Sequence, residues 1–232
     1  MADGYSRVAG RHGVCIAQNG PGITNCVTSI AAAYWAHTPV VMITPETGSM
    51  TLGLGGFQET EQLPIFSKIT KYQAQVNNRA RMAELTSRAF DRATLEMGPT
   101  QVNIPRDFFY GDIDCEIPRP LAIERGAGGE HSLDQAAALL AQAKFPVMLA
   151  GGGIIMGDAE ADDVALAELL QAPVCTSSLH NDACPARQPL AFGPPGHQGP
   201  TSAIQLHAKG ADGRTHSTRQ GASGMPRTHT PA

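Results

Sequence analysis

The stretch Val14-Cys15-Ile16-Ala17, followed by Asn19-Gly20-Pro21-Gly22, decides the fold class of this chain. A short apolar run predicts a buried strand, and Gly-Pro-Gly is strong turn chemistry. The alanine-rich residues 23–35 come next and predict a helix. Val40-Val41-Met42-Ile43 then predicts a second strand. The order strand, turn, helix, strand is typical of a parallel βαβ unit.

The same alternation continues toward the middle of the chain. Residues 79–97 predict one long amphipathic helix, and Gln101-Val102-Asn103-Ile104 predicts a further strand. The apolar residues of this helix recur at helical spacing: Met82, Leu85, Ala89, Ala93 and Met97. Because parallel sheets are covered by helices on both faces, we expect Val14, Val41 and Val102 to be buried.

A second unit follows a change in composition. Residues 115–130 are rich in proline and glycine and predict a linker between domains at 1–114 and 131–206. In the second domain, Ser132 is expected to cap a helix over 133–143. Two strands and a helix come after it, at 146–150, 173–176 and 159–170. The fold class is therefore α/β, with two consecutive parallel-sheet domains.

The end of the chain has a different character. Residues 207–232 contain almost no large apolar side chain and show no period. Such a segment buries too little apolar surface to offset the entropy of ordering. We expect it to be a disordered polar tail.

Composition excludes several classes of protein. The net charge is -4 and the lysines and arginines are scattered, so no nucleic-acid partner is expected. No run reaches the roughly 18 apolar residues of a membrane span, so no membrane partner is expected. The five cysteines include no C-x-x-C pair, which argues against a disulfide framework and indicates a cytoplasmic protein.

The turn after the first strand is the most informative candidate site. Ligands of parallel sheets gather at the carboxyl ends of the strands, although an ordinary strand-to-helix turn remains an alternative. Gln58 lies in a second candidate, a glycine-rich loop, which is also compatible with a merely solvated segment. Asp107 is compatible with a turn cap or with chemistry.

Other patterns give weaker signals. Gly151-Gly152-Gly153 departs from G-x-G-x-x-G, because Met156 stands where the last glycine would be, so a tight turn into a loop is expected. The eight histidines form no set with metal-ligand spacing, and no metal-binding residue is expected.

Several motifs, in order, resemble the pyrimidine-binding domain of the acetolactate-synthase-like thiamine diphosphate enzymes. The resemblance rests on Asn19-Gly20-Pro21-Gly22-Ile23-Thr24-Asn25, on Phe57-Gln58-Glu59 and on Asn103-Ile104-Pro105-Arg106-Asp107. Gly151-Gly152-Gly153 and Gly196-His197-Gln198-Gly199 are similar to the central domain of the same family. The resemblance covers residues 1 to about 206.

This resemblance implies a cofactor and a set of site residues. Gly20, Pro21, Gly22 and Asn25 would lie at the pyrimidine half of thiamine diphosphate, and Gln58 would face the substrate. In the family, Mg²⁺ and the diphosphate are held by a C-terminal domain that these residues do not match. The family's catalytic glutamate falls upstream of Met1, so no catalytic residue is assigned here. Two chains normally share each site, which implies a homo-oligomer.

Within the family, details such as Pro45-Glu46-Thr47-Gly48 resemble the sulfoacetaldehyde acetyltransferases. That resemblance implies a small-molecule acyltransferase of taurine degradation, which converts sulfoacetaldehyde and phosphate into acetyl phosphate and sulfite. The chain is then expected to be a fragment truncated at both ends and inactive alone. Two alternatives remain: a fragment of an acetolactate synthase or another thiamine diphosphate decarboxylase or lyase, and a non-catalytic α/β nucleotide-binding module.

Overall fold

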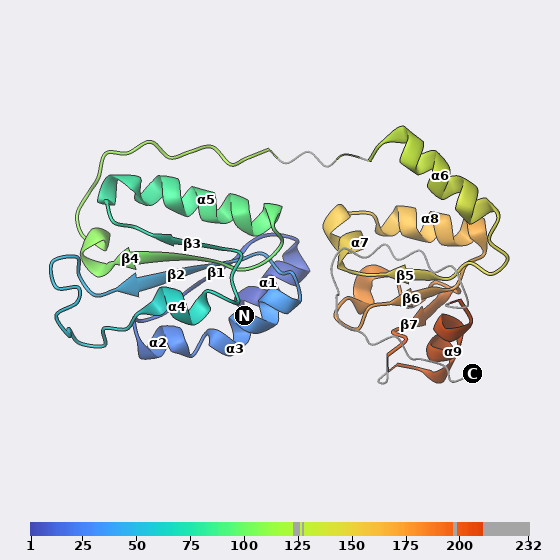
Figure 1. The fold of residues 1–232 in the computed structure, drawn as a ribbon, viewed down its shortest axis with the longest axis horizontal. Coiled ribbons are helices and arrows are strands. Elements are labelled where there is room, and N and C mark those ends of the chain that lie inside the picture. Colours follow the sequence, from blue (N-terminus) through green and yellow to red (C-terminus); the bar gives the residue numbers. More distant parts are fainter. Residues whose placement is uncertain (123–125, 127, 197–198, 211–232) are drawn as a thin grey trace. The chain divides into compact units, whose positions relative to one another are not determined.

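A computed structural model describes residues 1–122, 126, 128–196 and 199–210 of the chain. The chain divides into two compact units, Met1–Arg125 and Gly126–Ala232 (Figure 1). Each unit is built around a parallel sheet of its own. The α/β fold class with two consecutive parallel sheets is therefore confirmed.

The sheet of the first unit has four parallel strands in the order β1-β2-β4-β3. Their bounds are Gly13–Ile16 for β1, Val40–Glu46 for β2, Tyr72–Gln75 for β3 and Thr100–Pro105 for β4. The two central strands, β2 and β4, are almost entirely buried. β3 was not expected from the sequence.

Helices cover the two faces of this sheet. α5 (Met82–Leu95) lies on one face, while α2 (Pro21–Thr24), α3 (Val27–Trp35) and α4 (Gln62–Phe66) lie on the other (Figure 1). The core under α5 contains Val41, Ala74, Val76, Leu85, Ala89, Ala93, Val102 and Ile104. The opposite core contains Ile23, Ile30, Ala33, Val40, Met42 and Phe66.

Two expected helices of the first unit are broken. The helix expected over 23–35 is divided into α2 and α3 at Asn25 and Cys26. The helix expected over 79–97 begins with a 3₁₀ turn, Arg79–Arg81, before α5. Its predicted apolar stripe is buried at Leu85, Ala89 and Ala93. α1 (Ala2–Ala9) and a second 3₁₀ turn, Arg106–Phe109, complete the unit.

The prediction that Val14 is buried is wrong. Val41 and Val102 are fully buried, but the side chain of Val14 is 48% exposed. Val14 pairs in register with Val41 and therefore points to the face that α5 covers. Because β1 is one of the two edge strands, Val14 and Ile16 lie beyond the packed core on that face. A local apolar run does not reveal whether its strand is central or at an edge.

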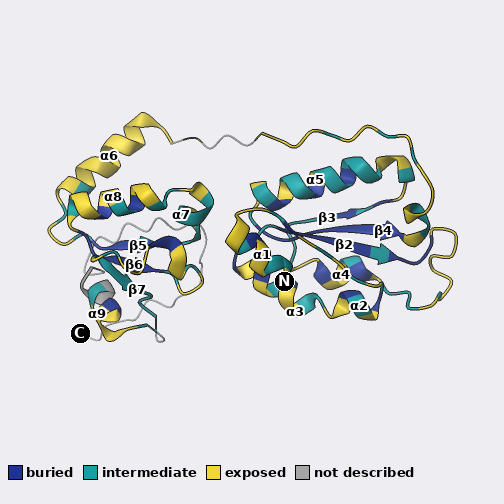
Figure 2. Cartoon of the chain, turned by 180° about the vertical axis from the view of Figure 1, so that it is seen from behind, coloured by how far each residue is buried: buried dark blue, intermediate teal, exposed yellow. Residues whose placement is uncertain are grey.

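The second unit has a three-stranded parallel sheet in the order β5-β6-β7. Its strands are Met148–Ala150 for β5, Val174–Thr176 for β6 and Ala191–Gly193 for β7. Its helices are α6 (Glu130–Ala141), α7 (Gly152–Gly157), α8 (Glu160–Leu170) and α9 (Thr201–Gly210), with a 3₁₀ turn at Asn181–Ala183. α6 is exposed along nearly its whole length (Figure 2).

Three expectations for the second unit need correction. Gly129, not Ser132, is the N-cap of α6, because the helix begins one turn earlier than its apolar pattern. Gly152 and Gly153 form the first turn of α7 rather than a loop. The polar tail was expected from residue 207, but α9 continues to Gly210. The rest of that tail, residues 211–232, lies outside the described residues. Among the described helices, none is long and apolar enough to cross a membrane.

Candidate active site

The turn after β1 requires glycine at residue 20. The backbone φ of Gly20 is +65°, in the left-handed region that L side chains rarely adopt. A Cβ at this position would lie 2.5 Å from the carbonyl oxygen of Gln58. The glycine therefore lets the loop that carries Gln58 pack directly onto the turn. Pro21 then occupies the first position of α2, where its fixed φ suits a helix start.

The side chain of Gln58 also contacts this turn. Gln18 donates a hydrogen bond from Nε2 to Oε1 of Gln58 over 2.5 Å. Gln58 itself has a φ of +59°, which is uncommon for a residue with a side chain and is often found at functional sites. The structure therefore brings together two of the predicted site elements, the Gly20-Pro21-Gly22 turn and Gln58. Gln18 was not singled out from the sequence.

The exposed groups at this edge face away from the core. Pro21 and Asn25 are exposed, whereas Ile23 between them is fully buried. Phe57 is 79% exposed beside Gln58. The carboxyl end of β1 therefore presents a proline ring, an aromatic ring and several amides. Apolar rings beside a few polar groups are typical of small-molecule sites in proteins.

Two carboxylates hold the glycine-rich loop between β2 and α4. Glu59 accepts hydrogen bonds from the backbone N–H groups of Gly53 and Gly56, the latter over 2.8 Å, and these bonds lower the pKa of its carboxyl. Asp107 accepts from the hydroxyl and the backbone N–H of Ser49, both over 2.7 Å, and its pKa is lowered for the same reason. Asp107 therefore fastens the loop, and Glu59 is engaged by backbone donors rather than directed to the turn.

A network of buried and half-buried amides lies under α4. Gln73 pairs in register with Gln101, and Gln75 pairs with Asn103. Asn103 accepts from Thr44 over 2.7 Å and donates to Gln75 over 2.7 Å. Gln75 also donates to the carboxylate of Glu46 over 2.8 Å. The alternations Gln73-x-Gln75 and Gln101-x-Asn103 could have indicated this network from the sequence, because alternate residues of a strand share one face.

Gln62 of α4 joins that network from the face of the sheet that α4 covers. It is 1% exposed and donates to the carbonyl oxygen of Pro45 over 2.8 Å and to Oδ1 of Asn103 over 3.2 Å. These bonds connect α4 to the end of β2, where the chain turns into the glycine-rich loop. The network thereby helps to fix where the loop begins.

The glycine cluster of the second unit has a different environment. A Cβ on Gly152 would lie 2.6 Å from Nε2 of His180. The imidazole therefore occupies the space above the first turn of α7. Gly152 is therefore explained by this packing within the chain.

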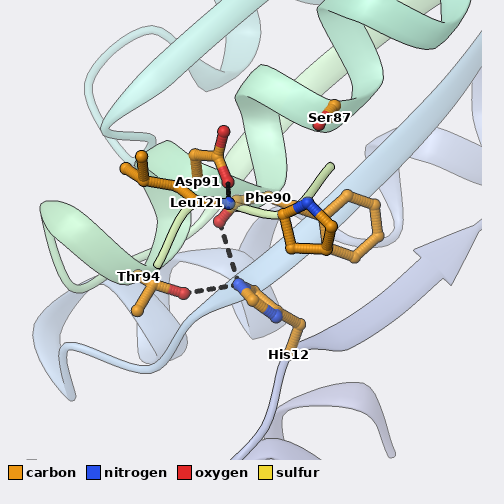
Figure 3. A pocket seen from close by; sticks show the side chains of 7 residues that line it. His12, Ser87, Phe90, Asp91, Thr94 and Leu121 are labelled. Carbon is orange, nitrogen blue, oxygen red and sulfur yellow. Dashed lines mark hydrogen bonds between the residues drawn. The ribbon is translucent and has the colours of Figure 1, made fainter. Parts of the chain in front are cut away.

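A shallow groove of about 380 Å³ lies beside α5 (Figure 3). It is lined by His12, Ser87, Phe90, Asp91, Thr94, Pro120 and Leu121. Nε2 of His12 lies 2.9 Å from the carbonyl oxygen of Phe90 and 2.5 Å from the hydroxyl of Thr94. Because His12 directly precedes β1, the groove lies at the amino end of that strand, opposite the edge that carries Gln58.

The residues that the structure describes include no group of three or more His, Cys, Asp or Glu side chains arranged to hold a metal ion. The thiols of Cys175 and Cys184 are buried, and that of Cys15 is half-buried. Burial raises the pKa of the Cys15 thiol to about 11, with a smaller contribution from Cys26. Burial also raises the pKa of Cys175 and Cys184. These thiols are therefore poor nucleophiles at neutral pH.

Both units match known protein families. Residues 1–65 match the family described as "Thiamine pyrophosphate enzyme, N-terminal TPP binding domain", and residues 133–213 match "Thiamine pyrophosphate enzyme, central domain". The solved structure of a thiamine diphosphate-dependent 4-hydroxybenzoylformate decarboxylase from Rhodococcus jostii has a TM-score of 0.74 at 22% identity, over 83% of this chain and 38% of that chain. Each of the two units therefore matches a domain family of the thiamine pyrophosphate enzymes.

Within this family, the chain is similar to sulfoacetaldehyde acetyltransferases. It is 65% identical to that of Alcaligenes xylosoxydans over 209 residues and 63% identical to that of Castellaniella defragrans over 208 residues. Each match covers 90% of this chain and 35% of the relative, so the chain spans about a third of the length of these proteins. A probable acetolactate synthase large subunit of Methanocaldococcus jannaschii is more distant, at 36% identity over 87% of this chain and 36% of the relative.

Proposed function

We propose that this chain supplies the pyrimidine-binding and central domains of a thiamine-diphosphate-dependent sulfoacetaldehyde acetyltransferase. The whole enzyme would convert sulfoacetaldehyde and phosphate into acetyl phosphate and sulfite, a reaction of taurine degradation. The observation that carries the proposal is the 65% identity to the Alcaligenes enzyme over 90% of this chain. The contact between Gln58 and the Gly20 turn supports it, because the resemblance requires these elements to lie together.

The proposed cofactor contacts come from the family resemblance, and the exposure of Pro21 and Asn25 at the turn supports them. Gly20, Pro21, Gly22 and Asn25 would hold the pyrimidine half of thiamine diphosphate at the carboxyl end of β1. When bound, thiamine diphosphate supplies a carbon nucleophile and an electron sink. The residues of this chain would orient the pyrimidine ring and, through Gln58, bind the substrate. Mg²⁺ and the diphosphate would be held by a segment that these residues do not match.

We further propose that the enzyme is a cytoplasmic homo-oligomer. The glycine-rich loop beside the candidate site exposes Met50, Leu52, Leu54 and Phe57, at 89%, 49%, 77% and 79% of their surface. Clusters of exposed apolar side chains are typical of surfaces that another chain covers. A partner chain at this loop would also enclose the exposed edge of the site. All five cysteines are free, which supports a reducing compartment.

A hybrid enzyme tests the proposed function directly. In this hybrid, the matching 209 residues of the Alcaligenes sulfoacetaldehyde acetyltransferase are replaced by those of this chain. We expect the hybrid enzyme to release sulfite and acetyl phosphate from sulfoacetaldehyde and phosphate when thiamine diphosphate and Mg²⁺ are present, as the parent enzyme does. A hybrid that folds but produces acetolactate from pyruvate, and no sulfite, would overturn the proposal in favour of the acetolactate synthases.

The isolated 232-residue chain serves as the complementary test. We expect it to release no sulfite, because the resemblance assigns the catalytic glutamate and the magnesium site to segments outside these residues. Loss of one general acid–base group typically lowers a rate by about 10² to 10⁴. Calorimetry that found tight, magnesium-dependent binding of thiamine diphosphate to the chain alone would contradict this expectation.

A further inference from the structure

We propose that Gln18 is a positioning residue that orients the side chain of Gln58 as a hydrogen-bond donor for an anionic oxygen of the substrate. The inference rests on the proposed function, which places Gln58 at the substrate. It adds a residue that the sequence motifs did not single out. It also adds a ligand chemistry, the oxygen of a sulfonate or a phosphate.

The orientation follows from the donors and acceptors of a primary amide. The side chain of glutamine has one oxygen that accepts and one NH₂ group that donates. Gln18 donates from Nε2 to Oε1 of Gln58, so the oxygen of Gln58 faces Gln18. The NH₂ group of Gln58 is bonded to the same carbon in the same plane and points away from the oxygen, and thus away from Gln18. What Gln58 offers to a ligand is therefore a donor.

The backbone near Gln18 and near Gln58 allows the two side chains to come into contact. Gly20 lets the carbonyl of Gln58 approach the turn, since a Cβ there would lie 2.5 Å from that oxygen. Gly22 leaves room for the side chain of Gln18, because a Cβ at residue 22 would lie 3.0 Å from the Cβ of Gln18. Gln58 is held at a φ of +59°, and the next residue, Glu59, is fixed to the loop backbone. Residues in this region of φ and ψ persist only where their surroundings hold them.

The ligand chemistry matches the substrates of the proposed reaction. A sulfonate and a phosphate both present several negatively charged oxygens, and hydrogen bonds to such oxygens are stronger than those between neutral groups. The nearest carboxylate in the sequence, Glu59, is engaged by the N–H groups of Gly53 and Gly56. Its charge is therefore partly compensated by these donors. An anion could approach the NH₂ group of Gln58 from the solvent side.

The test uses the whole 232-residue chain with isotope-labelled side-chain amides. Methanesulfonate and inorganic phosphate are added in separate nuclear magnetic resonance titrations, and tetramethylammonium chloride controls for ionic strength. Two variants probe the pair. Gln18→Met keeps the size of the side chain but removes the donor, and Gln18→Glu leaves only acceptors. Gln188→Met is the matched control, because it removes a glutamine hydrogen bond, to Glu168 over 2.8 Å, in the other unit.

We expect the NH₂ resonances of Gln58 to shift saturably with one of the two anions in the unmodified chain and in Gln188→Met. A response to methanesulfonate identifies the sulfonate as the source of the oxygen, and a response to phosphate alone identifies the phosphate. Gln18→Met should weaken the binding about fivefold, which corresponds to one lost hydrogen bond of about 1 kcal/mol. In Gln18→Glu the amide of Gln58 should reverse, with its NH₂ protons close to residue 18.

Three results would overturn the positioning role. They are unchanged anion binding in Gln18→Met, an unreversed Gln58 amide in Gln18→Glu, or no response of Gln58 to either anion in the unmodified chain. An unchanged spectrum at the amide of Val102 shows in each case that the first unit is folded. The titrations measure anion binding and not turnover. A hybrid enzyme that releases no sulfite would therefore contradict the proposed function without changing the result on Gln18 and Gln58.

Discussion

The turn after β1 and the turn after β5 both contain glycines, but the groups that approach these glycines differ. Both place glycines between the first strand of a parallel sheet and a helix. At Gly20 the approaching group is the backbone of Gln58, and Pro21 and Asn25 beside it stay exposed. At Gly152 the approaching group is the imidazole of His180, which fills the space above the helix. A glycine turn at the carboxyl end of a strand therefore marks a close approach, but it does not by itself mark a ligand site.

Of the changes that test this difference between the two turns, Gly20→Ala should have the largest effect on turnover and stability. The new Cβ would meet the carbonyl of Gln58 at 2.5 Å, in a backbone region that already disfavours a side chain. We expect the turn and the Gln58 loop to separate, which lowers turnover of the hybrid enzyme by roughly 10² and lowers the free energy of unfolding by about 2 kcal/mol. Steady-state kinetics and chemical denaturation measure the two effects.

Gly10→Ala is the matched control for this change. Gly10 has a similar φ of +61°, but no atom of another described residue lies within 4 Å of the added Cβ, apart from its chain neighbours. It should reproduce the backbone strain without the clash and leave turnover nearly unchanged. Equal losses of turnover in both variants would show that strain, rather than contact with Gln58, explains the glycine at residue 20.

Gly152→Ala should destabilise the second unit without altering the first. The Cβ would meet His180 at 2.6 Å, and overpacking of this kind costs about 1–2 kcal/mol. Amide hydrogen exchange at Cys175 of β6 and Val102 of β4 follows the two units in one experiment. The cost of Gly152→Ala should vanish when His180→Ala is already present. If it persists, His180 is not the reason for the glycine.

The two units should also respond to pH in opposite directions. In the second unit, Asp163 of α8 is 4% exposed, its Oδ2 has no hydrogen-bond partner among the described residues, and burial raises the pKa of its carboxyl. A raised pKa in an acid stabilises the fold below the pKa of the unfolded chain, and that stability is lost as the pH rises through the folded pKa. Asp163→Asn should therefore stabilise the second unit by about 1 kcal/mol at pH 7 and should remove this pH dependence. A loss of stability at pH 7 would contradict the assignment.

The smallest effect is expected in the glycine-rich loop of the first unit. The lowered pKa values of Glu59 and Asp107 mean that their stabilisation is present above the ordinary carboxyl pKa and is lost as the pH falls through the folded pKa. Glu59→Gln should increase amide exchange at Gly53 and Gly56 at neutral pH and weaken its acid dependence. Glu84→Gln is the control, because Glu84 also has a lowered pKa but pairs with Arg81 on the helical surface. Equal effects in both variants would exclude a local role for Glu59.

The alternation of strands and helices was predictable because it depends on local periodicity. The stripe Leu85, Ala89 and Ala93 and the runs at Val41 and Val102 were placed correctly for this reason. β3 was missed, because only Ala74 of its four residues is buried and apolar, while Gln73 and Gln75 on the opposite face are polar, so an apolar pattern does not detect the strand. The exposure of Val14 depends on strand order, which is a property of the assembled sheet.

The candidate site was only partly predictable. Gly20, Pro21, Gly22, Asn25 and Gln58 came from motifs that resemble a family, and their roles remain predictions. Gln18 carries no local signal, since its partner Gln58 is 40 residues away in the sequence. The engagement of Glu59 by backbone N–H groups likewise depends on how the loop folds back. Contacts of this kind appear only once the turn and the loop have been brought together.

The edge position of β1 has a practical consequence for anyone who purifies this chain. β1 pairs with β2 on one side, and its four residues include neither a charged side chain nor a proline. Val14 and Ile16 are exposed beside that edge. Natural sheets usually protect their edges with lysine, proline or a bulge, since a bare edge promotes aggregation. Concentrated solutions of the isolated chain should therefore precipitate with time, and light scattering at increasing concentration will reveal it.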